Sequence, residues 1–342
     1  MSPVIQKLPI LILSPHNRCN CRCLMCDIWK TTDAREMSPE DFDAHLAGID
    51  ALGVEWVVLT GGEPLMHRDL FRFCQGLRAR GIRITLLSSG LLLERHAEPI
   101  VRNIDEVIVS LDGPPAIHDR IRRVPGAFEQ LARGIAAMRA IDPACSVKAR
   151  CTVQRLNCGA LADTVDAARA IGIGQISFLA ADLTSPAFNR QHGWESTHTS
   201  KVEISIHDID VLRDQIQHLI DAETDEFVAE SPAKLARIVR HFEAHLDLVQ
   251  EEAPPCNAPW VSAVVETDGT VKPCFFHAPI GKVSAQVSLS DVINGFEAIA
   301  FRKNLDVASN PVCRQCVCSL NWKNAYKPTA IVGVGGLVKP LT

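Results

Sequence analysis

Three cysteines near the amino end of the chain have a spacing that suits an iron–sulfur cluster. Cys19, Cys23 and Cys26 form the pattern C-x3-C-x2-C just after an apolar run at residues 10–13. Cysteine thiolates are the usual ligands of such clusters, and three of them can hold three corners of a [4Fe–4S] cube. No fourth cysteine follows at ferredoxin spacing, so one iron is expected to stay open to a small ligand. Cys21, inside the same loop, is expected to be inert.

A second group of residues follows the next expected strand, in the sequence Thr60-Gly61-Gly62-Glu63-Pro64. The two glycines allow the backbone to come close to a ligand, and the Glu63 carboxylate can pair with a cationic group. An iron–sulfur cluster with an open iron can bind S-adenosylmethionine (SAM) and pass an electron to it, and both are cofactors of radical chemistry.

The two motifs, in this order, resemble those of the radical SAM superfamily. The resemblance implies that Glu63 and nearby backbone groups hold the methionyl amine of SAM. It also implies that the reduced cluster cleaves SAM to methionine and a 5′-deoxyadenosyl radical, which abstracts hydrogen from an unactivated C–H bond. The cofactor-binding residues expected from the resemblance are Gly61, Gly62, Glu63, Pro64, Met25, Ser88, Ser110 and Arg150.

The last four of these rest on position. Met25 stands where relatives have an aromatic residue, and it can pack on the adenine. Ser88 begins a Ser-Ser-Gly sequence where relatives often have Thr-Asn-Gly. Ser110 opens Ser-Leu-Asp-Gly, which is followed by His-Asp-x-Ile-Arg at residues 118–122, and this too resembles radical SAM enzymes. Arg150 matches the family's carboxylate-binding arginine if it points inward, and a solvated strand end is the alternative.

A second set of cysteines lies toward the carboxyl end, as Cys256, Cys274, Cys313, Cys316 and Cys318. An Asp-Gly hairpin signal at residues 268–269 separates the first two, and residues 290–305 are expected to form a helix. This order resembles the cluster-binding SPASM extension in its shortened "twitch" form. The resemblance implies that Cys256, Cys274, Cys313 and Cys316 bind an auxiliary [4Fe–4S] cluster. A four-thiolate zinc site is the alternative, and the choice between Cys316 and Cys318 stays open.

The elements that must position these residues alternate between strand and helix patterns. Strands are expected at residues 10–13, 54–60, 82–88, 106–111, 146–153 and 173–179. Helices are expected at residues 38–52, 68–80, 91–102, 127–141 and 160–171. Repeated βα units predict an α/β fold with a parallel sheet. The resemblance implies a partial (βα)6 barrel with its chemistry at the carboxyl ends of the strands, followed by a small hairpin and helix extension.

The βα rhythm stops after residue 179, which indicates further domains. Residues 182–206 look irregular, and helices are expected at about 206–222 and 231–249. The expected domains are a radical SAM partial barrel at 1–181, a helical insert or lid for substrate selection at 182–253, a twitch-type cluster domain at 254–326 and a tail at 327–342.

Composition narrows the class of protein. The chain has 342 residues, a formal net charge of −5 and 47% hydrophobic residues. It has no dense basic run of the kind that binds nucleic acid, and no 18-residue apolar stretch or signal-peptide pattern. We therefore expect a cytoplasmic protein without nucleic-acid or membrane partners. Thirteen cysteines in a reducing compartment indicate metal ligands or catalytic thiols rather than disulfides.

Three interpretations of function follow. The first is an oxidoreductase or lyase acting on a small polar metabolite, such as a sugar, an aminosugar or a nucleoside acid, in natural-product biosynthesis. It is favoured because about ten residues precede the first strand, leaving no room for an N-terminal peptide-recognition domain. The second is a peptide maturase that forms a crosslink or thioether, and the third is a non-catalytic metal-stabilised scaffold. Asp182 is an expected substrate contact, and a flavodoxin- or ferredoxin-type protein is the expected electron donor.

Overall fold

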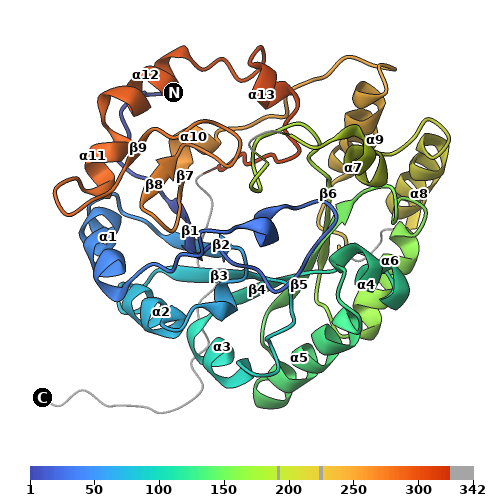
Figure 1. Ribbon diagram of the computed structural model, residues 1–342, viewed down its shortest axis with the longest axis horizontal. Coiled ribbons are helices and arrows are strands. Elements are labelled where there is room, and N and C mark those ends of the chain that lie inside the picture. The colour runs from blue at the N-terminus through green and yellow to red at the C-terminus, as the bar shows by residue number, and fades with distance from the viewer. Residues whose placement is uncertain (191–192, 223–225, 324–342) are drawn as a thin grey trace, which may run out of the picture.

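The computed structural model describes residues 1–190, 193–222 and 226–323, and its first half is a series of βα units (Figure 1). The strands of this half are β1 (Ile10–His16), β2 (Trp56–Gly61), β3 (Arg83–Ser88), β4 (Glu106–Ser110), β5 (Val147–Val153) and β6 (Ile176–Ala180). Its helices are α1 (Pro39–Ala51), α2 (Leu70–Arg78), α3 (Ala97–Asn103), α4 (Pro115–Arg122), α5 (Ala127–Ile141) and α6 (Leu161–Ala170). The predicted α/β fold is confirmed, and the helices lie on the outer side of the curved sheet.

Local sequence explains these elements. At the start of α1, Ser38 accepts a hydrogen bond from the Asp41 amide at 3.0 Å and Pro39 occupies the first helical position. On β5, Val147, Ala149, Cys151 and Val153 are buried, whereas Lys148, Arg150 and Thr152 occupy the other face. The helix α4 was not anticipated, and the expected helix at 91–102 is replaced by turns followed by α3 at Ala97–Asn103.

The strands formed by the described residues belong to one open, nine-stranded sheet with the order β6-β5-β4-β3-β2-β1-β7-β8-β9. The additional strands are β7 (Ser262–Val265), β8 (Thr270–Lys272) and β9 (Gly281–Lys282). β1 to β6 pair in parallel, and β7 continues the parallel sheet on the free edge of β1. β8 and β9 then pair antiparallel. The predicted hairpin therefore extends the barrel sheet directly, which places the second set of cysteines beside the first strand.

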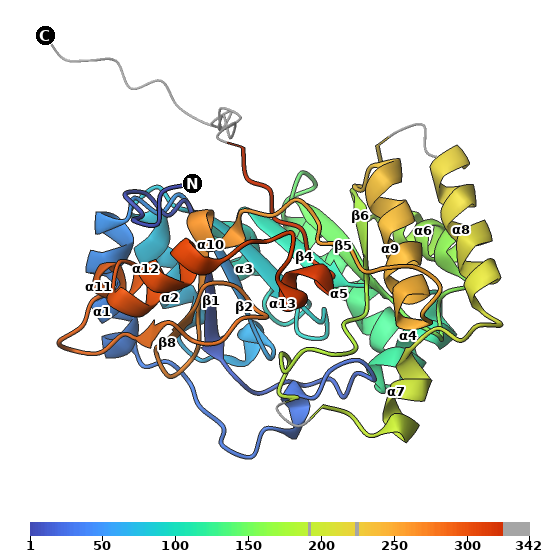
Figure 2. The same ribbon diagram turned by 90° about the horizontal axis from the view of Figure 1, so that it is seen from above.

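Other helices surround this sheet. They are α7 (Ser196–Val202), α8 (Ile209–Ala222), α9 (Pro232–His245), α10 (Ala258–Val261), α11 (Leu289–Ile293), α12 (Phe296–Asn304) and α13 (Pro311–Arg314). Figure 2 shows α8 and α9 at one end of the molecule and α11 and α12 beside α1 at the other. None of the helices formed by described residues combines the length and apolarity that a bilayer crossing needs.

Two predictions from the sequence for the second half of the chain were wrong. The single helix expected at 290–305 is broken between α11 and α12, because the Asn294 side chain exchanges two hydrogen bonds of 2.9 Å with the Ile5 backbone. The segment expected to be irregular at 182–206 contains α7. The expected tail at 327–342 lies outside the described residues.

Candidate active site

The first three cysteines lie on one loop at the carboxyl end of β1. Cys23 is buried, and Cys19 and Cys26 are half-buried. Neighbouring elements fix the loop through its backbone: the Glu63 amide donates to the Arg18 carbonyl at 2.8 Å, and the Leu24 amide donates to Ile121 at 3.0 Å. Burial raises the pKa of Cys26 to about 12, so this thiol needs a metal to become a thiolate near neutral pH.

Cys21, which the sequence predicts to be inert, lies buried beside two of the three cluster cysteines. It is 1% exposed, and its thiol hydrogen-bonds with those of Cys19 and Cys23. These hydrogen bonds raise the pKa of Cys21 above its usual range and lower the pKa of Cys23 to about 6. Four sulfur atoms therefore gather in this loop, and the proposed cluster ligands are the three with the family spacing.

The glycines after β2 form a close backbone contact with this loop. Gly61 has a φ of +120°, which favours glycine, and a Cβ atom there would lie 2.3 Å from the His16 carbonyl oxygen. A Cβ atom on Gly62 would lie 1.9 Å from the Arg18 carbonyl oxygen. The expected cradle of Gly61, Gly62 and Glu63 therefore lies directly against the cysteine loop.

Glu63 is the central polar group of this cradle. It is fully buried, and its carboxylate accepts hydrogen bonds from the Ser89 amide at 2.7 Å, the Ser89 hydroxyl at 2.6 Å and the Ser88 hydroxyl at 3.1 Å. The Leu65 amide adds a bond of 3.1 Å. Burial raises the pKa of Glu63, although these donors oppose the effect. The structure thus brings Glu63 and Ser88 together, and Pro64 is buried beside them in a short 3-10 turn.

Ser110 and Arg150 are side-by-side neighbours on β4 and β5. They lie on the face of the sheet opposite the buried side of β5, where Ser110 is half-buried and Arg150 is exposed. The Arg150 guanidinium donates to the Ser177 hydroxyl at 3.3 Å, and no ion pair links it to a carboxylate of the described residues. Met25 is half-buried and packs against the core next to Cys26.

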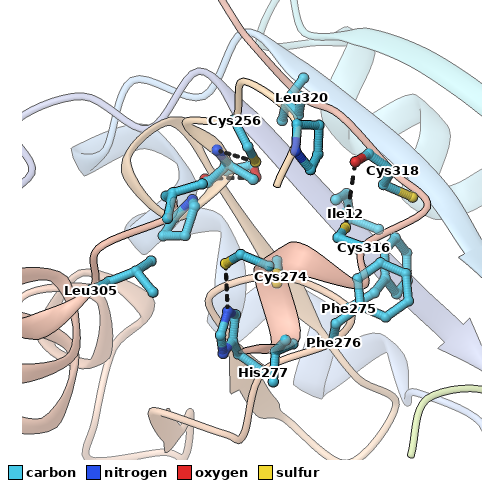
Figure 3. Close-up of a pocket in the computed structure, with 17 residues that line it drawn as sticks. Ile12, Cys256, Cys274, Phe275, Phe276, His277, Leu305, Cys316, Cys318 and Leu320 are labelled. Atoms are coloured by element: carbon cyan, nitrogen blue, oxygen red, sulfur yellow. Dashed lines mark hydrogen bonds between the residues drawn. The ribbon is translucent and has the colours of Figure 1, made fainter. Parts of the chain in front are cut away.

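The later cysteines meet in one cavity of about 160 Å³ (Figure 3). Its thiols come from the four predicted ligands and from Cys318, and most other lining residues are apolar, including Phe275 and Leu305. His277 contacts the Cys313 sulfur through Nε2 at 3.4 Å. The structure therefore brings together the four cysteines that the sequence assigns to one site, with a fifth beside them.

Both sulfur sets are chemically suited to iron–sulfur clusters, in which each iron is held by a cysteine thiolate. The loop thiols and the apolar five-thiol cavity offer the soft sulfur donors that such clusters require.

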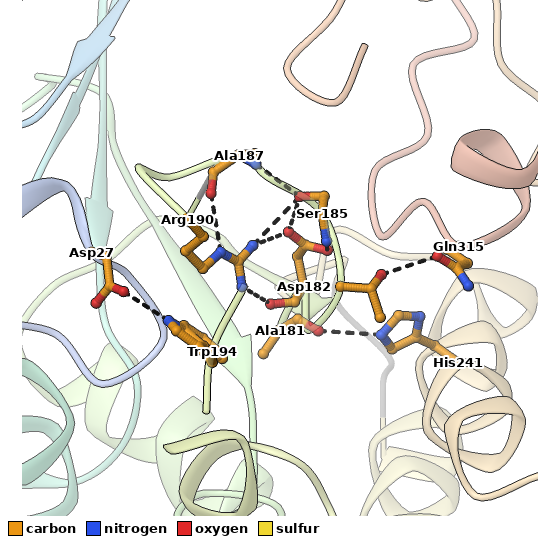
Figure 4. Close-up of polar contacts among 10 residues, drawn as sticks. Asp27, Ala181, Asp182, Ser185, Ala187, Arg190, Trp194, His241 and Gln315 are labelled. Carbon is orange, nitrogen blue, oxygen red and sulfur yellow. Dashed lines mark hydrogen bonds and ion pairs between the residues drawn. The ribbon is translucent and has the colours of Figure 1, made fainter. Parts of the chain in front are cut away.

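Asp182, the expected substrate contact, is occupied by other partners (Figure 4). Its carboxylate forms a buried ion pair with Arg190 and a hydrogen bond with Ser185. The Arg190 guanidinium stacks over the Trp194 ring, with 4.5 Å to the ring centroid. The Trp194 indole donates to Asp27 at 2.9 Å, directly after Cys26. Asp182 thus helps to hold the cluster loop and does not present a free carboxylate.

Sequence reasoning missed several residues of the site. Ser89 and Asn20 join the cradle to the cluster loop through a hydrogen bond of 3.1 Å between their side chains. Asp112 and Arg122 form a buried ion pair next to Cys23. The Ser-Ser-Gly and His-Asp-x-Ile-Arg motifs contain Ser89 and Arg122 and could have indicated them, whereas no sequence motif indicated Arg190.

The buried His118 predicts a pH dependence of stability. Burial lowers the pKa of His118 to about 3, whereas the unfolded chain has the ordinary value of 6.5. The unfolded state therefore binds the extra proton as the pH falls below 6.5, so the stability present above that pH is lost on acidification. We expect wild type to lose about 1 kcal/mol more than His118→Asn between pH 7 and pH 5.5. Urea unfolding at both values measures this, and an equal loss in the two proteins would contradict it.

Comparison with known proteins identifies two domains in the chain. The radical SAM superfamily model matches residues 13–154, and the SPASM iron–sulfur cluster-binding domain model matches residues 256–317. An AdoMet-dependent heme synthase of Methanosarcina barkeri is 29% identical over 159 residues, which is 45% of each chain. A probable GTP 3′,8-cyclase of Thermococcus kodakarensis is 30% identical, over 53% of this chain and 61% of the relative. The chain thus spans about half the length or less of most of the curated relatives it matches.

Solved structures share the fold. SuiB of Streptococcus suis, bound to S-adenosylmethionine, has a TM-score of 0.66 at 14% identity over 93% of this chain and 74% of SuiB. The protein anSMEcpe with bound AdoMet has a TM-score of 0.64 at 17% identity, over 90% and 83% of the two chains. The two domain types imply SAM and iron–sulfur clusters as cofactors. The chain therefore contains a radical SAM domain at residues 13–154, followed by a SPASM-type iron–sulfur cluster-binding domain at residues 256–317.

Proposed function

We propose that this chain binds a [4Fe–4S] cluster through Cys19, Cys23 and Cys26 and cleaves SAM reductively. The observation that carries this proposal is the Glu63 carboxylate. It is fully buried and accepts four hydrogen bonds from neutral donors, yet no cationic side chain of the described residues pairs with it. A buried carboxylate without a cation is costly, and the ammonium group of SAM would supply the missing charge.

The remaining pocket residues have distinct proposed tasks. Gly61 and Gly62 keep the cradle backbone against the cluster loop, and Arg150 would receive the carboxylate of SAM in a two-pronged contact. Ser110, next to Arg150 in the sheet, would hydrogen-bond the nucleoside, and Met25 would pack on the adenine. When bound, the cluster supplies the electron that converts SAM to methionine and a 5′-deoxyadenosyl radical. A flavodoxin- or ferredoxin-type protein is the proposed donor of that electron.

We assign Cys256, Cys274, Cys313 and Cys316 to an auxiliary [4Fe–4S] cluster that accepts an electron from the substrate or positions it. Cys274→Ala should halve the iron and sulfide content of the reconstituted protein, because one of two clusters loses a ligand. Cys74→Ala removes a buried thiol of α2 that lies outside both sulfur sets and should leave the iron content unchanged. Unchanged iron in Cys274→Ala would remove that residue from the ligand set.

The proposed substrate is a small polar metabolite, a sugar, aminosugar or nucleoside acid, which is dehydrogenated or decarboxylated. Hydroxyl and cationic side chains on one sheet face support this, namely Ser110, Arg150, Thr152 and Ser177. Residues 182–253 would select the substrate, because their irregular part packs directly on the cluster loop. A peptide substrate is the second candidate, since SuiB, which shares the fold, is known in complex with its precursor peptide SuiA.

Anaerobic incubation with dithionite and SAM tests the core proposal. We expect 5′-deoxyadenosine from wild type and none from a variant in which Cys19, Cys23 and Cys26 are all alanine. A wild-type protein that holds iron but never cleaves SAM would instead support a metal-stabilised scaffold. Deuterated aminosugars, nucleoside acids and short peptides then separate the two substrate classes, because only the true class transfers deuterium into 5′-deoxyadenosine.

A further inference from the structure

A buried ion pair lies beside the cluster loop, next to Cys23. Arg122 ends α4, and Asp112 follows β4; they are 7% and 0% exposed. Their side chains approach to 2.6 Å between Nη2 and Oδ2. The second Asp112 oxygen accepts the Thr152 amide at 2.9 Å, and the Asn157 side chain donates to the Asp112 carbonyl at 3.0 Å. Asp112 is therefore fixed to β5 and the loop after it, and it in turn fixes the guanidinium.

The other terminal nitrogen of the Arg122 guanidinium points toward a cysteine of the cluster loop. Its Nη1 atom donates a hydrogen bond to the Cys23 sulfur at 3.4 Å, and Cys23 is itself 7% exposed. The backbone of the same helix end binds both neighbours of Cys23. The Arg22 amide donates to the Arg122 carbonyl at 3.2 Å, and the Leu24 amide donates to the Ile121 carbonyl at 3.0 Å. One helix terminus therefore contacts three successive residues of the loop.

We propose that Arg122, held by Asp112, is a positioning residue that sets the reduction potential of the cluster bound at Cys23. This inference rests on the proposed function, because it requires a cluster at that thiol. Hydrogen bonds to the sulfurs and net charge are two of the properties that tune iron–sulfur potentials. A buried cation with an N–H···S bond favours the form with one more electron, so Arg122 raises the potential and Asp112 partly offsets its charge.

The experiment is a redox titration of the reconstituted full chain, followed by electron paramagnetic resonance. Addition of SAM identifies the core cluster, because only its signal should change. Arg122→Met should lower the potential by about 59 mV. For a one-electron couple, this shift lowers the ratio of reduced to oxidised cluster about tenfold at a fixed solution potential. Asp112→Asn should shift the potential in the opposite direction, because it removes a buried negative charge and keeps the side-chain shape.

Arg302→Met is the matched control. Arg302 is 4% exposed, and within the described part of the chain it donates to the backbone carbonyls of Pro3 and Ile293 and to no cysteine, so its loss should leave the potential unchanged. If Arg122→Met does not hold iron, Arg122→Lys retains the charge without the fork and should give a smaller downward shift. This proposal alone would be overturned if Arg122→Met and Arg122→Lys both kept the wild-type potential. It would also be overturned if Arg122→Met and Asp112→Asn shifted the potential in the same direction. A wild-type protein without a SAM-responsive cluster would overturn the proposed function instead.

Discussion

Gly62→Ala should lower the free energy of unfolding by roughly 3 kcal/mol or more and prevent stable cluster binding. The new Cβ atom would lie 1.9 Å from the Arg18 carbonyl oxygen and 2.3 Å from its carbonyl carbon. Both are backbone atoms, so no side-chain rotation can relieve the clash. Separation of the two segments would also break the hydrogen bond from Glu63 to Arg18, which joins the SAM cradle to the cluster loop.

Gly174→Ala is a suitable control for this change. Its Cβ atom would lie 3.5 Å from the Val147 carbonyl oxygen, an ordinary contact, and we expect a change within about 1 kcal/mol. Urea unfolding of both variants and the iron content after anaerobic reconstitution measure the two effects. If Gly62→Ala keeps the iron and the unfolding midpoint of wild type, the close contact at Arg18 is not a constraint on this site.

Local patterns predicted the part of the site that is built from sequence neighbours. The βα alternation placed β2 and β3, and the Gly-Gly-Glu-Pro motif placed Glu63 at the end of β2, where the structure has it. The period of two along β5 accounts for Lys148, Arg150 and Thr152 sharing one face. These features depend on backbone geometry over a few residues, so the sequence alone determines them.

Features that depend on distant partners could not be predicted. The pairing of β7 with β1 joins residues about 250 positions apart, and no local pattern records which sheet edge is free. The ion pairs of Asp182 with Arg190 and of Asp112 with Arg122 join residues that are close in the sequence, but they form only when the intervening segment folds back, and no local pattern predicts that. Its position at a strand end predicted that Asp182 contacts the substrate. In the structure its carboxylate instead pairs with Arg190.

That partner gives the second large prediction: Arg190→Leu should cost about 3–5 kcal/mol of stability, because it leaves Asp182 buried without its cation. Asp182 and Arg190 are 7% and 2% exposed, and the guanidinium also donates to the Ala187 carbonyl at 3.0 Å. Its loss should loosen the segment that holds Asp27, where the Phe188 carbonyl accepts the Asp27 amide at 3.1 Å. Iron content should fall with stability, since Asp27 follows Cys26 directly.

The double variant Asp182→Leu/Arg190→Leu separates an unpaired charge from lost packing. Replacing both members of a buried pair with apolar groups is often close to neutral, so the double variant should be more stable than Arg190→Leu alone. Arg133→Leu, which breaks an exposed pair with Glu94, should change stability by at most about 1 kcal/mol. Urea unfolding of the three variants decides the matter. A double variant no more stable than Arg190→Leu would show that Arg190 acts through its stacking on Trp194, and the segment would then be held by aromatic packing instead of by the Asp182 charge.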